Sequence, residues 1–354
     1  MTVTEAPQRS FSADYTVSRT LEPLSPYFDD PRVTEIRINR PGEVVCHLHG
    51  GKEIHQREDI DWAYLNRLRS TLISSNRLDN EPVSNVLLPN GARGIICMPP
   101  AVLEGTIQIA FRKHSDVVKS LDELAAEGAF TDWTDVSFNR PTPEQVETEM
   151  QRRDFQRLDA GEAELLRLLR EGDLTGFFRE AVRLKRNIVI AGKTGSGKTT
   201  FTRSLILEVP KSERIITIED VHELTLREDQ SEVGHLLYGS VPGRMSVSEC
   251  LAACMRLSPD RIMLAELRDS AALEYLEGLN NGHPGSITTT HAGGALMTFN
   301  RIATLIRKSE AGRLLDLADI MRELHTTIDV TVFMHDRQIK EVFYDPMFKK
   351  SKLG

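Results

Sequence analysis

Residues 192–199 read GKTGSGKT, which matches the phosphate-binding pattern GxxxxGK[ST] in full. An apolar run at residues 188–190 comes directly before it. After it, Phe201, Leu205 and Val209 recur at helical spacing. A strand, a glycine-rich loop and a helix in this order are the context in which the pattern binds a nucleotide. The sequence therefore predicts a nucleotide-binding loop, and a glycine-rich structural turn is the alternative.

Each residue type in the loop has a chemical reason. Glycines let the backbone wrap closely around phosphate oxygens, so that successive N–H groups and the helix N-terminus face the negative charge. Lys198 is placed to reach the β- and γ-phosphates of ATP, and Thr199 to offer its hydroxyl to magnesium. ATP and magnesium are therefore the expected cofactors. The residues expected to bind the nucleotide are Gly192, Lys193, Thr194, Gly195, Ser196, Gly197, Lys198, Thr199 and Thr200.

Carboxylates follow two further apolar runs. Glu266 comes directly after residues 262–265, where a P-loop protein needs an acid beside the metal or the attacking water, and it is the predicted catalytic residue. Residues 218–224, IEDVHEL, place three acids at the end of another predicted strand. Acids this crowded need a cation or a basic partner, because like charges raise one another's pKa. A solvated surface position is the alternative for both segments.

Histidines and cysteines complete the candidate chemistry. His291 ends the predicted strand 287–290, where it could contact the γ-phosphate, and a hydrogen-bonded structural histidine is the alternative. The chain has no HExxH or similar metal-ligand spacing, and its cysteines include no CxxC pair. The sequence therefore predicts no zinc site and four core thiols, Cys46, Cys97, Cys250 and Cys254.

Composition limits the possible classes of protein. Of the 354 residues, 40% are hydrophobic and 27% charged, which is typical of a soluble globular chain. The formal net charge of −8 argues against a protein that coats nucleic acid. The N-terminal stretch lacks the basic flank and apolar run of a secretory signal, and no charge-free run is apolar enough to span a bilayer. The sequence predicts a cytoplasmic protein.

Hydrophobic patterning predicts two domains of different type. In residues 1–130, short alternating runs, turns and one amphipathic helix predict a small N-terminal α+β domain. Residues 131–160 are polar and contain two prolines, so they are predicted to form a linker. In residues 161–354, short apolar runs alternate with helical patterns, which predicts an α/β domain with buried parallel strands and helical crossovers.

Four of these segments together resemble one known family. GKTGSGKT, ITIEDVHEL, RLSPDRIMLAELR and GHPGSITTTHA occur in the order and spacing of the secretion ATPase superfamily. VTEIRINRPGEV near the start is similar to the branch that powers type IV secretion and conjugation. The resemblance spans nearly the whole chain and implies an ATP-hydrolysing motor, built as a homohexameric ring, with nucleotide between the N-terminal domain and a RecA-like C-terminal domain.

The resemblance also implies roles for individual residues. Lys198 and Thr199 would bind phosphate and magnesium, and Glu266 would polarise the attacking water. Glu219 would lie in the acidic box and, with Thr199 and Glu266, hold magnesium partly through water. His291 would sense the γ-phosphate. Arg93 and Arg112 would act on the phosphates from the N-terminal domain, and either Arg256 or Arg268 would act across a subunit boundary.

The resemblance further implies partners. These are the inner-membrane secretion channel and the coupling ATPase, with the chain held peripherally on the cytoplasmic side of the inner membrane. The basic tail at residues 349–352 offers a possible contact with an anionic membrane surface. One departure is Ala265, where the family usually has glycine before the catalytic acid.

Alternative functions remain at this point. One is a type II secretion or pilus assembly and retraction ATPase, although the four-cysteine zinc element typical of type II secretion members is missing. Others are a hexameric nucleic-acid motor, which the acidic balance disfavours, and a small-molecule P-loop kinase.

Overall fold

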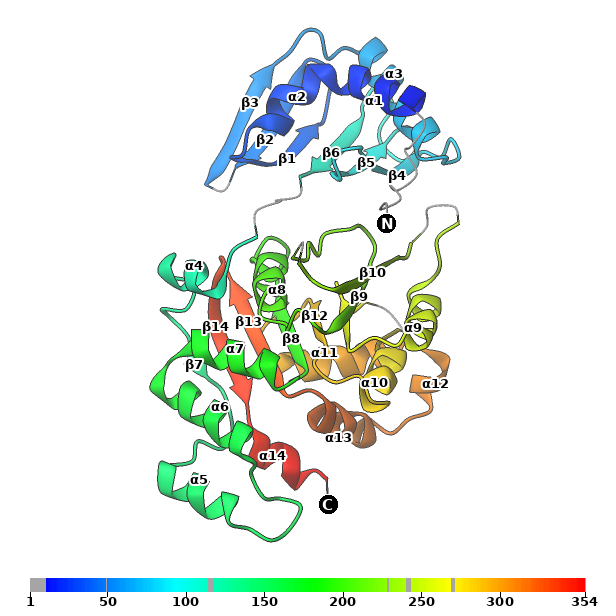
Figure 1. Ribbon diagram of the computed structural model, residues 1–354. Coiled ribbons are helices and arrows are strands. Elements are labelled where there is room, and N and C mark those ends of the chain that lie inside the picture. Colours follow the sequence, from blue (N-terminus) through cyan, green and yellow to red (C-terminus); the bar gives the residue numbers. More distant parts are fainter. Residues whose placement is uncertain are drawn as a thin grey trace, which may run out of the picture. The chain divides into compact units, whose positions relative to one another are not determined.

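The computed structural model divides into two units by the contacts between its residues (Figure 1). It describes residues 11–48, 50–113, 118–227, 229–239, 243–268 and 271–353. The N-terminal unit comprises residues 1–116 with 240–244, and the C-terminal unit comprises residues 117–239 with 245–354.

The N-terminal unit contains a six-stranded antiparallel sheet, ordered β3-β2-β1-β6-β5-β4. Alternating apolar side chains such as Ile36 and Ile38 are buried on one face of this sheet, together with Leu65 and Leu68 of a helix that Asp61 caps at the N–H of Tyr64. The predicted α+β architecture is thus observed. Its elements are α1 (Phe11–Leu21), η1 (Glu22–Leu24), α2 (Ser25–Asp29), β1 (Val33–Ile38), β2 (Glu43–Leu48), β3 (Gly51–Gln56), α3 (Trp62–Ser75), β4 (Val83–Leu87), β5 (Arg93–Cys97) and β6 (Gln108–Arg112).

The C-terminal unit is built on an eight-stranded sheet, ordered β10-β9-β11-β12-β8-β13-β14-β7. All neighbouring strands are parallel except β13 and β14, which form a hairpin. Parallel strands end at one edge of a sheet, so the residues after β8, β9, β11 and β12 gather there. The strands are β7 (Thr134–Asp135), β8 (Ile188–Gly192), β9 (Arg214–Glu219), β10 (Glu232–Leu237), β11 (Arg261–Leu264), β12 (Ile287–Thr290), β13 (Val330–His335) and β14 (Gln338–Tyr344).

Helices cover both faces of this sheet (Figure 1). In β8, Ile188 and Ile190 pack with α6, α7 and α8, whereas Val189 packs with α9, α10, α11 and α13. Burial on both faces explains why the central strands read as continuous apolar runs. The helices are α4 (Leu121–Ala126), α5 (Pro143–Met150), α6 (Ala160–Glu171), α7 (Leu174–Arg183), α8 (Lys198–Ile206), α9 (Val247–Arg256), α10 (Ala272–Asn280), α11 (Met297–Ile306), α12 (Glu310–Arg313), α13 (Leu317–Thr327) and α14 (Pro346–Ser351).

Residues 131–160 do not form the linker that the sequence predicts. They contribute β7, which pairs with β14, and α5, which begins with a capping box on Thr142. Val146 and Leu158 are buried in the same apolar cluster as α6 and α7. Val146 is the one buried residue of α5, so the segment reads as polar although it packs against the C-terminal unit. The two units instead divide at residues 116 and 117.

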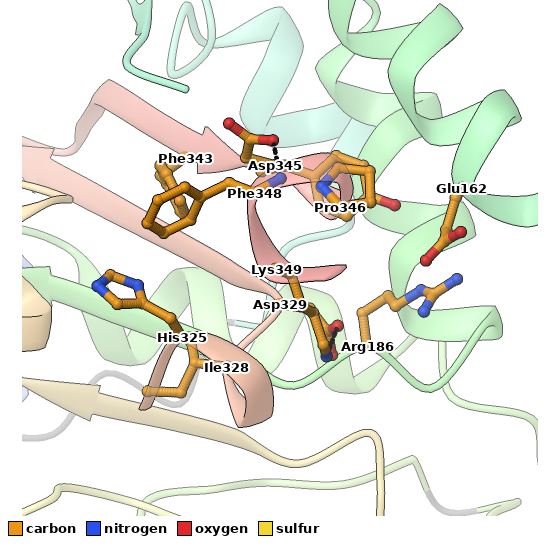
Figure 2. Close-up of a pocket in the computed structure, with 11 residues that line it drawn as sticks. Glu162, Arg186, His325, Ile328, Asp329, Phe343, Asp345, Pro346, Phe348 and Lys349 are labelled. Carbon is orange, nitrogen blue, oxygen red and sulfur yellow. Dashed lines mark hydrogen bonds and ion pairs between the residues drawn. The ribbon is translucent and has the colours of Figure 1, made fainter. Parts of the chain in front are cut away.

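The basic C-terminal tail is engaged by acids of its own chain. Lys349 Nζ lies 2.6 Å from Asp329 Oδ1, and Lys350 Nζ lies 3.1 Å from Glu162 Oε2. Figure 2 shows Lys349 and Asp329 beside a pocket of about 10 Å³, which has room for roughly one water molecule. Both acids are buried, so these pairs hold α14 against α6 and against the residue that precedes β13. The predicted contact of the tail with an anionic membrane is therefore not supported, because two of its lysines are already paired.

Candidate active site

The loop at residues 192–199 connects the end of β8 to the start of α8. Its backbone requires glycine. Gly197 has a φ of 96°, a left-handed conformation that other residues rarely adopt. At Gly192, an added Cβ would lie 2.5 Å from both Met334 O and Ser196 Oγ, so no side chain fits. Since Gly197 has no side chain to cap α8, the first N–H groups of this helix are not capped from that position and suit an anion.

Lys198 is buried and folded back across the loop. Its Nζ donates to Gly192 O at 2.8 Å and to Lys193 O at 2.9 Å. Thr199, the next residue, has its Oγ1 3.5 Å from Glu223 Oε2. An ammonium group, a hydroxyl and a carboxylate thus stand together at the N-terminus of α8. Oxygen ligands of this kind are those that magnesium prefers.

Glu266 lies just beyond β11, with its side chain 17% exposed. Arg268 donates to Glu266 Oε2 at 2.5 Å, and His291 Nε2 lies 3.1 Å from Glu266 Oε1. Burial raises the pKa of this carboxyl, but the hydrogen bond from Arg268 and the charges of Arg268, His291 and Lys198 lower it overall. Glu266 is therefore an ionised carboxylate beside the loop.

His291 joins the loop to this carboxylate. It follows β12, and its Nδ1 lies 3.1 Å from Gly192 O, while Nε2 faces Glu266. Gly192 O thus meets both Lys198 and His291. The structure thus brings together Lys198 at the start of α8, Glu266 after β11 and His291 after β12.

Glu219 is placed differently from the prediction of a magnesium contact. Its side chain is fully buried. One oxygen, Oε1, accepts hydrogen bonds from the backbone N–H groups of Glu223 at 2.7 Å and Leu224 at 2.6 Å. The other, Oε2, accepts from Thr217 Oγ1 at 2.8 Å and faces His222 Nδ1 at 3.0 Å. These partners come from residues 217–224 and not from the loop 192–199, so Glu219 holds the turn that follows β9, and Glu223 is the acid of this segment that approaches Thr199.

The basic partners that the crowded acids require come from two sources. Arg268 Nη1 lies 3.4 Å from Asp220 Oδ2, while His222 and His235 approach Glu219. Burial by itself raises the pKa of Glu219, but hydrogen bonds from the two histidines and two backbone N–H groups outweigh it and hold the pKa well below its usual range.

The predicted arginines occupy separate places. Arg93 and Arg112 are directly opposite each other on β5 and β6 of the N-terminal unit, so they share a face of that sheet. In the C-terminal unit, Arg256 is exposed in the last turn of α9, whereas Arg268 pairs with acids of its own chain.

Comparisons with known proteins identify the family of the chain. Residues 155–336 match the family described as Type II/IV secretion system protein. The VirB11 type IV secretion protein of Brucella suis is 38% identical over 346 residues, which cover 94% of this chain and 91% of that protein. The chain belongs to the VirB11 family of type IV secretion ATPases. This membership confirms the predicted superfamily and its type IV branch, and it removes the type II, helicase and small-molecule kinase alternatives.

Solved structures confirm the fold. The crystal structure of the Brucella suis VirB11 ATPase in complex with sulphate superposes with a TM-score of 0.53 at 38% identity, covering 97% of this chain and 98% of that one. The Legionella pneumophila ATPase DotB gives 0.54 at 16% identity, covering 99% and 88%, and so shows the fold alone. The chain is a RecA-like ATPase motor of the VirB11 family, as predicted. Among the residues that the structure describes, no helix has the length and apolar character needed to cross a bilayer.

Sequence reasoning missed several residues that surround the VirB11-type site. Glu223 was one of three crowded acids, with nothing to single it out from its neighbours. Arg203 Nε donates to Glu223 O at 2.6 Å, so it supports the same turn from α8. His235 becomes a neighbour of Glu219 only through the parallel pairing of β10 with β9, in which it lies opposite Thr217. Only a correct strand order and register could have revealed this contact.

Proposed function

We propose that this chain binds ATP with magnesium at the loop 192–199 and hydrolyses it with Glu266 as the residue that polarises water. One observation carries the proposal. Lys198 and His291 both reach the carbonyl of Gly192, and His291 also reaches Glu266, so a cation, a histidine and a carboxylate converge at the loop. Phosphoryl transfer depends mainly on positioned charge, which this arrangement supplies.

Lys198 and Thr199 would act on the phosphates. Lys198 exchanges its two carbonyl acceptors for β- and γ-phosphate oxygens, which carry more negative charge than a carbonyl. The remaining nucleotide contacts come from the backbone of residues 192–197 and from Thr200. Magnesium, when bound, would offset the negative charge of the phosphates. Thr199 would hold it directly and Glu266 through water, with Glu223 in the place predicted for Glu219.

Glu266 and His291 would respond to the γ-phosphate. Arg268 and His291 keep Glu266 ionised and able to accept a hydrogen bond from water. When Lys198 leaves the Gly192 carbonyl, the hydrogen bonding of His291 changes as well, because both meet the same oxygen. This shared contact gives His291 a physical means of sensing the γ-phosphate.

Assembly and partners follow from the family. We infer a homohexameric ring in which Arg93 and Arg112 act on the phosphates from the N-terminal unit. Because Arg268 is paired within its own chain, Arg256 is the better candidate to act across a subunit boundary. Hydrolysis would move one unit against the other and drive export, pilus biogenesis or DNA transfer. The inner-membrane secretion channel and the coupling ATPase would be its partners on the cytoplasmic side of the membrane.

ATP turnover and particle mass together test the proposal. Lys198→Gln is expected to lower the turnover number by at least about 100-fold, because it removes the charge that acts on the phosphates. Mass photometry should show the same ring for this variant and for the wild type. Lys211→Gln is the matched control, since Lys211 pairs with Asp229 on the surface of the same unit and should leave turnover unchanged. Undiminished turnover by Lys198→Gln would refute the proposed site.

A further inference from the structure

Glu219, His222 and His235 form a compact cluster at the end of β9. Glu219 is the last residue of β9, His222 lies in the turn that follows, and His235 lies on the adjacent strand β10. His222 Nδ1 is 3.0 Å and His235 Nδ1 is 3.7 Å from Glu219 Oε2. One nitrogen or oxygen from each residue lies within 4.8 Å of the other two. Two imidazoles and a carboxylate thus converge on a small volume.

These separations fit a tetrahedral metal site. Zinc binds histidine nitrogen and carboxylate oxygen at about 2.0–2.2 Å, which places neighbouring ligand atoms of a tetrahedron roughly 3.3 Å apart. The two separations at Glu219 Oε2 lie on either side of this value. Small side-chain rotations of His222 and His235 are therefore enough to surround a metal ion, with no change in strand register. His235 Nδ1 would exchange its contact with Thr217 Oγ1, at 2.7 Å, for the metal.

The surroundings of the cluster also suit a cation. Glu219 is a fully buried anion whose orientation is fixed by Thr217 and by two backbone N–H groups. Such outer contacts orient the ligands of metal sites. The side chains of His222 and His235 are 51% and 35% exposed, so an ion has a path from solvent and a fourth position remains open to water.

The type of ligand selects the class of metal. Imidazole nitrogens suit zinc and its first-row neighbours, whereas magnesium prefers oxygen ligands. We propose that Glu219, His222 and His235 bind one divalent first-row transition-metal ion, for which zinc is the probe. This site is separate from the magnesium position proposed at Thr199. It has no recognisable sequence motif, because β10 brings His235 to the other two residues only in the folded chain.

The site is connected to the catalytic loop through one carboxylate. Glu219 Oε1 holds the N–H of Glu223, whose side chain faces Thr199. An ion on Oε2 would fix Glu219 and therefore the turn that carries Glu223. Zinc binding is expected to reduce the freedom of this turn during ATP turnover.

Zinc titration of the full-length chain, free of any histidine tag and stripped of metal, tests the proposal. One zinc ion should bind per chain. Loss of even an outer contact of a metal site costs about 10–100-fold in affinity. The double variant H222A/H235A is therefore expected to bind at least about 100-fold more weakly. His55→Ala is the matched control, because His55 also stands beside a glutamate, with Nε2 3.6 Å from Glu53 Oε2, in the other unit. It should bind zinc as the wild type does.

Further measurements make the result independent of folding and of ATP turnover. His222→Gln and His235→Gln, taken singly, keep a polar side chain in case the double variant does not fold, and each should weaken binding. X-ray absorption should show nitrogen and oxygen ligands and no sulfur, which excludes the cysteines. Lys198→Gln should retain zinc, since it changes the nucleotide loop alone. Equal affinity in wild type and the histidine variants, or sulfur ligation, would mean that the two histidines only hydrogen-bond Glu219.

Discussion

The ends of β9 and β11 are adjacent in the C-terminal sheet, and each bears a carboxylate, yet the two carboxylates have opposite surroundings. Glu219 is completely buried, whereas the Glu266 side chain is 17% exposed. Backbone N–H groups, a hydroxyl and a histidine surround Glu219. Arg268 and His291, which follow β11 and β12, surround Glu266.

This difference separates a carboxylate that holds structure from one that can react. The pKa of both groups is lowered although burial opposes it, so both are ionised. The backbone N–H groups that hold Glu219 cannot leave without unfolding the turn. The side chains that hold Glu266 can rearrange when a nucleotide enters. A carboxylate at a strand end is therefore a candidate for catalysis only if its partners are mobile side chains and part of it meets solvent.

Removing the charge of Glu266 should have the largest effect of these changes, and the effect should be on ATP turnover. Glu266→Gln keeps the size of the side chain but weakens its ability to polarise water, so the turnover number is expected to fall by at least about 100-fold, or roughly 3 kcal/mol in the activation barrier. ATP affinity should change little, because Lys198 and the loop backbone remain. Steady-state turnover and fluorescent-nucleotide binding measure the two quantities. A variant that turns over ATP normally would remove the distinction between the two carboxylates.

The same change at Glu219 should affect stability instead. Glu219→Gln replaces a buried acceptor of several hydrogen bonds with an amide, half of which donates, and is expected to cost about 2–4 kcal/mol of folding free energy. The melting temperature should then fall by roughly 5–10 °C. Thermal unfolding in the presence of a chelator measures this without a contribution from bound metal. If Glu219→Gln lost turnover as fully as Glu266→Gln while melting like the wild type, Glu219 would have to be a catalytic residue.

The position of Glu266 could be predicted from the sequence, for a physical reason. Parallel strands buried on both faces give short apolar runs, and the residue after each run lies at the same edge of the sheet. Lys198, Glu266 and His291 could therefore be placed together from their positions after such runs. In the structure His291 contacts Glu266 directly, and His291 and Lys198 both contact the carbonyl of Gly192.

The surroundings of Glu219 could not be predicted from the sequence in the same way. An apolar run shows that Glu219 ends a strand, but it does not show that its Oε1 accepts from two backbone N–H groups and its Oε2 from Thr217. His235 depends on the pairing register of an edge strand that has a weak apolar pattern. The sequence predicts a linker at residues 131–160 because the short helix there has one buried residue, Val146, and so shows no apolar periodicity.

Thr217→Val should lower the folding free energy by less than Glu219→Gln does, because it removes only one of the partners of Glu219. The hydroxyl of Thr217 is fully buried and contacts Glu219 Oε2 at 2.8 Å and His235 Nδ1 at 2.7 Å. Valine has nearly the same shape, so the loss is mainly that of a hydrogen bond to a charged group, about 1–2 kcal/mol. Thr331→Val is a matched control, since it removes one buried bond to a neutral carbonyl, Ala295 O, and should cost less. If chemical denaturation gave the same loss of folding free energy for both variants, the Thr217 hydroxyl would stabilise the fold no more than a bond to a neutral carbonyl does.

The smallest effect is expected at Ala265, where the family usually has glycine. The peptide groups of Ala265 are held on both sides: its N–H donates to Ile218 O at 3.0 Å, and its carbonyl accepts from Thr289 Oγ1 at 2.8 Å. Because these bonds fix the backbone before Glu266, the added freedom of glycine is mostly suppressed in the folded state. Ala265→Gly should therefore cost about 0.5–1 kcal/mol of stability, chiefly through the unfolded chain, and change turnover by less than about twofold. A turnover change of tenfold or more, with the fold intact, would show that this methyl group sets the approach of Glu266 to water, so that Glu266 depends on the backbone as well as on its mobile partners.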